Sequence, residues 1–130
     1  MISNTTMARG HELLQAVTQA SGTAVVDSLK DIAPDFADWI VGFAYGEVMA
    51  RPGLDLRTRQ IATVAALTAL GTATPQLKVH MQGALNVGCT PGEVVEAVLQ
   101  MAVYAGFPAA VNGLNAAREV FAARGISITR

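Results

Sequence analysis

The stretch of sequence that decides the fold is TPQLKVHMQGALNVG, residues 74–88. Thr74 and Pro75 are typical of a helix start, because a threonine hydroxyl can accept a hydrogen bond from a first-turn N–H and proline fits the first helical position. Gly88 is typical of a helix end, since glycine readily takes the left-handed conformation that often occurs there. We therefore predict a helix over this stretch.

His80 lies on the apolar face of this expected helix. The residues that share its face by helical spacing are Leu77, Met81, Ala84 and Leu85. An imidazole ionises near neutral pH, so its place among apolar side chains is unusual. The more common interpretation is a core histidine bonded to a carbonyl group. The alternative is a proton donor or acceptor in a buried pocket, and the sequence leaves both open.

The composition favours a single domain over residues 1–130, with loose ends at 1–5 and 126–130. The chain is 52% hydrophobic and 15% charged, and its mean hydropathy of +0.38 is high for a soluble monomer. The longest apolar stretches, such as 61–70, are too short for a bilayer, which needs ~20 residues. The N-terminus lacks the pattern of a signal peptide. We therefore expect that the chain forms a homo-oligomer and that it is not a membrane protein.

Charge, cysteine and histidine usage exclude further classes of function. The net charge is −1 with acids and bases interspersed, so there is no basic stripe for nucleic acid. The single cysteine, Cys89, allows no intrachain disulfide and fits the reducing cytoplasm, where we expect the protein. A thiol before the helix start at Thr90 can be activated, but a small residue packed at a turn is the commoner role. His11 and His80 have no second ligand at i+4, so we expect no metal site.

The rest of the chain also shows helical patterns. Thr90, Pro91 and Glu93 have the spacing of a capping box, which predicts a helix to about residue 105. Further helices are expected at about 6–20, 25–32, 34–50, 56–70 and 108–123, with Gly22 as the break between the first two. No segment alternates with the period of a strand. The predicted fold is therefore all-α, with about seven helices.

Arg59 lies in the most apolar of these helices, 56–70, which we expect to be buried on several sides. A buried guanidinium needs either a carboxylate partner or an anionic ligand. Glu47 and Glu93 are the candidate partners. Ion pairing and ligand binding are equally consistent with the sequence.

Six short motifs then occur in an order that resembles the 4-carboxymuconolactone decarboxylase family, over about residues 29–121. They are RPGL at 51–54, TR at 58–59, QLKVH at 76–80, ALNVG at 84–88, EVVEAVLQ at 93–100 and VYAGFPAAVN at 103–112. The resemblance implies the all-helical fold of the alkyl hydroperoxidase D proteins. It also implies a ring-like homo-oligomer, often a trimer or a hexamer.

The peroxidase branch of that superfamily carries its chemistry on a Cys-x-x-Cys-x-x-x-His motif. His80 matches the histidine, but Ala73 and Gln76 stand where the cysteines would be. Gln60 stands where many relatives have glutamate. The chain therefore resembles the decarboxylase branch, which also lacks the cysteines.

This resemblance implies a cofactor-free carboxy-lyase of aromatic-acid catabolism, in the β-ketoadipate pathway. Its substrate would be 4-carboxymuconolactone or a related small anionic lactone. His80 would be the general acid that protonates the enolate-like anion after CO2 leaves, and Glu47 would orient the imidazole. The implied substrate-binding residues are Arg51, Arg59, Asn86 and Tyr104.

Two alternatives belong to other functional classes. One is a peroxidase or other oxidoreductase that uses Cys89 as a lone reactive thiol, which the absence of a second cysteine disfavours. The other is a member that only binds a small acid, or that catalyses another proton transfer or a lactone ring opening.

Overall fold

The computed structural model describes residues 1–127, and every regular element among them is helical. Six α-helices and one π-helix confirm the all-α prediction for this part of the chain. The contacts within the chain form two compact units, residues 1–56 and the part from residue 57 onward. Among the described residues, no helix combines the length and the apolar character that crossing a membrane requires.

Unit 1, residues 1–56, contains α1 (Asn4–Ser28), α2 (Pro34–Trp39) and the π-helix η1 (Ile40–Met49). The side chain of Ser3 caps α1 by accepting a hydrogen bond from the N–H of Thr6. The helix thus begins inside the stretch 1–5, which we expected to be loose. It also joins the two expected helices 6–20 and 25–32, with a kink at Gln19, where φ is 53°. The predicted break at Gly22 is therefore wrong by three residues.

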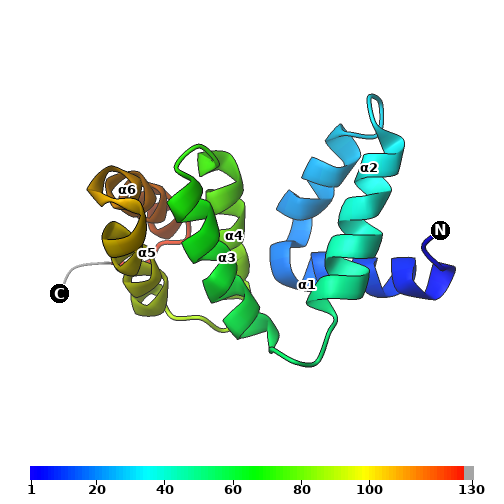
Figure 1. Ribbon diagram of the computed structural model, residues 1–130, viewed down its shortest axis with the longest axis horizontal. Coiled ribbons are helices and arrows are strands. Elements are labelled where there is room, and N and C mark those ends of the chain that lie inside the picture. The colour runs from blue at the N-terminus through cyan, green and yellow to red at the C-terminus, as the bar shows by residue number, and fades with distance from the viewer. Residues whose placement is uncertain (128–130) are drawn as a thin grey trace. The chain divides into compact units, whose positions relative to one another are not determined.

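Glycines bring α1 and η1 unusually close, and Figure 1 shows the two helices crossing. A Cβ added to Gly10 would lie 2.0 Å from the carbonyl oxygen of Val41. A Cβ added to Gly46 would lie 2.5 Å from the carbonyl oxygen of Thr6. The side chain of Arg9 spans the same crossing, because its Nε donates to the carbonyl oxygen of Gly46 at 2.9 Å. The core of unit 1 comprises Leu14, Val17, Val26, Ala37, Val41 and Tyr45.

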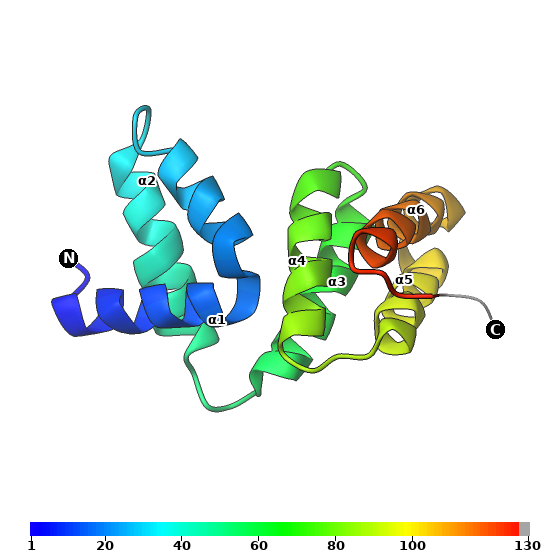
Figure 2. The same ribbon diagram turned by 180° about the vertical axis from the view of Figure 1, so that it is seen from behind.

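Unit 2 contains α3 (Leu56–Leu70), α4 (Thr74–Asn86), α5 (Pro91–Ala105) and α6 (Phe107–Ala123), of which α3 begins at the last residue of unit 1. Figures 1 and 2 show α3 beside α4, and α5 beside α6, from both sides. The core of the unit is mostly aliphatic, with one phenylalanine and one methionine. It includes Val64, Leu77, Met81, Ala84, Val94, Val98, Ala117, Val120 and Phe121.

The ends of the helices in unit 2 test the capping predictions. The Thr90–Glu93 capping box is confirmed: the hydroxyl of Thr90 accepts from the N–H of Glu93 at 3.1 Å, and the Glu93 carboxylate accepts from the N–H of Thr90 at 2.8 Å. Gly88 takes the expected positive φ, 102°. The prediction for Thr74 is wrong, because Ala73 occupies the N-cap of α4 and no side chain caps the helix there.

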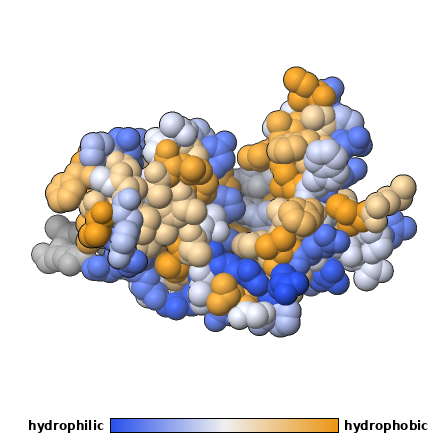
Figure 3. Space-filling view, viewed as in Figure 1, coloured by the Kyte–Doolittle hydropathy of each residue, from blue (hydrophilic) through white to orange (hydrophobic). Residues whose placement is uncertain are grey.

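The surface of α3 differs from the expectation of a helix buried on several sides. Its buried residues are Gln60, Val64 and Thr68, which form a single stripe at a spacing of four. Leu70 is 64% exposed in the chain. Each unit also has orange, apolar areas on the face drawn in Figure 3. Such surfaces are consistent with self-association, which stays a prediction.

The C-terminal stretch 126–130 was expected to be loose. Ile126 is instead half-buried, and its N–H donates to the carbonyl oxygen of Phe121 at 2.9 Å. Residues 128–130 lie outside the part of the chain that the structure describes.

Candidate active site

His80 lies on α4 with its imidazole directed toward α3. Its neighbours on the same face of α4, Leu77, Met81 and Ala84, are buried, and His80 itself is half-buried. The ring atom Nδ1 lies 3.1 Å from Oε1 of Gln60 on α3. The expected inward position of the imidazole is therefore confirmed, and its partner is a side-chain amide oxygen.

Gln60 is the functional candidate whose contact the sequence did not reveal. Its side chain has no exposed surface, and it begins the buried stripe of α3 that continues with Val64 and Thr68. Its amide nitrogen, Nε2, has no hydrogen-bond partner among the described residues. The sequence does show that Gln60 is a polar residue at helical spacing from buried residues of α3. It does not show the contact with His80, because no sequence pattern relates two residues on different helices.

Burial controls the charge of His80. Loss of solvent around the ring lowers its pKa from the usual 6.5, because burial disfavours the charged imidazolium. The imidazole is therefore neutral at physiological pH. A neutral imidazole has one N–H and one lone pair, so this side chain can accept a proton and pass it on.

The other predicted site residues of unit 2 lie on α3, α4 and α5. Arg59 is the neighbour of Gln60 on α3 and is half-buried. Asn86 faces the end of α6, where its Oδ1 accepts a hydrogen bond from Arg124 at 3.0 Å. Tyr104, near the end of α5, is 78% exposed. Asn86 and His80 therefore contact different helices, although both belong to α4.

Of the two carboxylate partners expected for Arg59, Glu93 needs correction. Glu93 forms its ion pair with Arg57 instead, and this guanidinium also donates to the carbonyl oxygen of Gly88 at 3.3 Å. Backbone hydrogen bonding from Thr90 and the contact with Arg57 lower the pKa of the Glu93 carboxyl group. The Glu93 carboxylate therefore serves the capping box at the start of α5.

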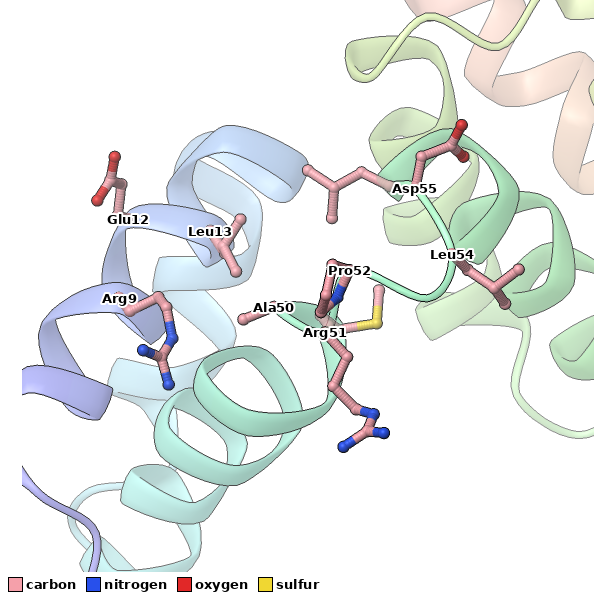
Figure 4. A pocket seen from close by; sticks show the side chains of 10 residues that line it. Arg9, Glu12, Leu13, Ala50, Arg51, Pro52, Leu54 and Asp55 are labelled. Atoms are coloured by element: carbon pink, nitrogen blue, oxygen red, sulfur yellow. The ribbon is translucent and has the colours of Figure 1, made fainter.

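Glu47 and Arg51 both belong to unit 1. Glu47 is an exposed residue of η1. Arg51 follows η1 and lines a pocket of about 390 Å³ between α1 and the chain after η1. Figure 4 shows Leu13 and Ala50 directed into this pocket, with Arg9 and Arg51 at its edge. The sequence did not predict Arg9, because the α1–η1 crossing that places it there is tertiary.

Cys89 is a core residue of unit 2. It is only 5% exposed, and its Sγ donates to the carbonyl oxygen of Arg57 at 3.5 Å. Buried cysteines of this kind are usually inert toward oxidants and electrophiles. The interpretation as a small residue packed at a turn is confirmed, which weighs against a lone reactive thiol.

Comparison with known proteins assigns the chain to a family. The sequence model of the carboxymuconolactone decarboxylase family matches residues 34–119. The chain belongs to this family. The matched region takes in His80 and Gln60, and it includes α2, η1, α3, α4 and α5.

Three known proteins are similar in sequence to this member of the carboxymuconolactone decarboxylase family. A 4-carboxymuconolactone decarboxylase of Acinetobacter baylyi is 40% identical over 102 residues, 78% of this chain and 75% of the relative. An uncharacterised 15.0 kDa protein of Paracoccus denitrificans is 31% identical over 87% of this chain and 85% of its own length. A nitrosuccinic acid decarboxylase of Metarhizium robertsii is 39% identical over 58% of this chain and 52% of its own length. The decarboxylase names agree with the expected class of carboxy-lyase.

Proposed function

We propose that this family member is a decarboxylase of a small anionic lactone, 4-carboxymuconolactone or a close analogue, with His80 as the general acid. The observation that carries the proposal is the half-buried imidazole held 3.1 Å from Gln60. Two relatives support the reaction class: one is named for 4-carboxymuconolactone and the other for nitrosuccinic acid. Both names combine loss of CO2 with a small acidic substrate.

The proposed reaction needs one proton and no redox change. The bond between the substrate carbon and its carboxylate breaks, and CO2 leaves as a neutral molecule. The electron pair of that bond passes into the conjugated lactone as an enolate-like anion. Protonated His80 then transfers its proton to the carbon, and solvent returns a proton to the imidazole. General acid catalysis of this kind contributes typically ~10²–10⁴ in rate.

The low pKa of His80 fits this sequence of steps when the substrate is an anion. In the free protein, burial keeps the imidazole neutral. A carboxylate bound beside the ring favours the imidazolium, so the acid forms in the complex. Arg59, next to Gln60 on α3, is the cation nearest in sequence to this pair and is our candidate for holding a substrate oxygen.

The other roles stay proposals from the sequence. These are orientation of the imidazole by Glu47, and substrate binding by Arg51, Asn86 and Tyr104. The homo-oligomer, as a trimer or hexamer, and the cytoplasmic location are proposals of the same kind. The pocket that Arg9 and Arg51 line also contains Glu12 and Asp55, so its lining carries charges of both signs.

The decisive experiment measures CO2 release from 4-carboxymuconolactone by the purified protein and by His80→Ala. We expect the variant to lose about 10²-fold or more in kcat, the range of a lost general acid. The matched control is His11→Ala, because His11 is an exposed histidine of α1. Full activity in His80→Ala would refute the acid role. Tight binding of the lactone by wild-type protein without CO2 release would favour a binding protein or another reaction.

A further inference from the structure

Gln60 holds a position that packing alone does not explain. Its side chain is fully buried on the α3 stripe, among residues that favour an apolar group. Thr68, the other polar residue of the stripe, satisfies its hydroxyl within its own helix, at 2.8 Å from the carbonyl oxygen of Val64. Gln60 instead directs its carboxamide to another helix, and the imidazole of His80 is its partner there.

The polarity of this contact decides where the proton of the neutral imidazole sits. An amide oxygen only accepts, so the Oε1 of Gln60 requires a hydrogen on Nδ1 of His80. The neutral ring carries only one N–H, which leaves the lone pair on Nε2. The opposite end of the carboxamide, Nε2 of Gln60, has no partner among the residues described. Among the described residues, this carboxamide is therefore held by its hydrogen bond to His80.

We propose that Gln60 is a positioning residue that holds His80 as the Nδ1–H tautomer and so makes Nε2 of the imidazole the atom that exchanges protons. The proposal rests on the proposed function only for its catalytic consequence, because the tautomer is a property of the free protein. A ring without this anchor can rotate about its side-chain torsions and exchange tautomers, which misplaces the reactive nitrogen. In histidine-dependent catalysis, such an orienting partner serves both geometry and tautomer.

The first test reads the tautomer in the wild-type protein without substrate. Long-range ¹H–¹⁵N NMR of protein labelled at histidine distinguishes the two nitrogens at mildly alkaline pH, where the ring is neutral. The His80 signals are assigned by their loss in His80→Gln, and the exposed His11 serves as an internal reference. We expect Nδ1 of His80 to be protonated. A dominant Nε2–H tautomer overturns the proposal, whatever the catalytic activity.

The second test separates the acceptor from the bulk of Gln60. Gln60→Met keeps the approximate size and removes the acceptor, whereas Gln60→Glu keeps an acceptor oxygen. We expect Gln60→Met to lose the fixed tautomer and about 10- to 100-fold in kcat, with little change in KM. Gln60→Glu should retain the Nδ1–H signal. Equal tautomer populations in Gln60→Met and the wild type would contradict the proposal.

Thr68→Val is the matched control for these variants. It replaces another buried polar residue of the same stripe by an isosteric apolar one, two helical turns away. We expect it to leave the His80 tautomer and kcat unchanged, so an equal loss would show a merely structural role for Gln60. If Gln60→Met fails to fold, the wild-type tautomer still decides. If the wild type releases no CO2, the proposed function fails while the tautomer result stands.

Discussion

The close crossing of α1 and η1 makes Gly10 the residue of unit 1 where one added methyl group should cost the most. In Gly10→Ala, the new Cβ would lie 2.0 Å from the carbonyl oxygen of Val41, 2.8 Å from its carbonyl carbon and 3.2 Å from the backbone nitrogen of Gly46. An ordinary contact between carbon and a carbonyl oxygen is about 3.3 Å or longer. The two helices must therefore separate by roughly 1.3 Å along this line.

The loss of stability in Gly10→Ala depends on whether the contacting atoms can move. All three contacting atoms belong to the backbone, so no rotamer change relieves the clash. Overpacking costs about 1–3 kcal/mol in general, and we expect Gly10→Ala at the upper end. A gap of 0.5–1 Å between packed surfaces also forfeits roughly a quarter to a half of their dispersion energy. Each kcal/mol lowers Tm by about 4 °C in a domain of this size, between the values for smaller and larger domains, so a loss of ~3 kcal/mol lowers it by about 12 °C.

The assay is thermal and urea unfolding of three glycine variants of unit 1. In Gly42→Ala, the three atoms nearest to the new Cβ belong to the side chains of Ile2, at 2.5 and 2.9 Å, and of Met7, at 2.7 Å. Side chains can move more easily than backbone, so this variant should cost about 1 kcal/mol. Gly53→Ala meets nothing within 4 Å and should stay within about 0.5 kcal/mol of the wild type. A Gly10→Ala protein as stable as Gly53→Ala would refute the close crossing.

Two further predictions concern protons at His80. Its pKa lies below 6.5 because of burial, so the unfolded chain binds a proton there more readily than the folded chain. The free energy of unfolding should therefore fall as pH drops below about 6.5, and the fall should level off below the folded pKa of His80. The His80→Gln variant should lack this fall when unfolding is measured as a function of pH. The same pH dependence in the variant and the wild type would contradict the burial effect. Binding of an anionic lactone should raise the pKa and take up a proton, which calorimetry in buffers of different ionisation enthalpy detects. A binding heat that is independent of the buffer would argue against an imidazolium in the complex.

Local chemistry made most of the fold predictable. The capping box of Thr90 and Glu93 and the glycine at 88 set helix ends by interactions within a few residues, so the sequence alone identifies them. The error at Gly22 has a cause within α1, because the kink lies at Gln19 and Gly22 packs against Thr18 on the other side of it. A Cβ there would lie 1.8 Å from the hydroxyl oxygen of Thr18, so this glycine allows close packing where we expected a helix break.

The candidate site was predictable only in part. Helical spacing placed His80 inward, because the apolar face of α4 repeats in the sequence. Its partner Gln60 is twenty residues away on another helix, and a contact of that kind depends on how α3 and α4 pack. Asn86 shows the converse, since its contact with Arg124 depends on the packing of α4 against the end of α6. Sequence patterns identify faces of helices, and the fold decides which faces meet.

The buried position of Cys89 gives this protein an internal reporter of its own opening. Its sulfur is the only thiol in the chain and is shielded within the core of unit 2. A thiol-specific dye can react with Cys89 only when the surrounding helices separate, so the labelling rate reports how often unit 2 opens. Each modified molecule then records a single event at one known place, without any engineered label.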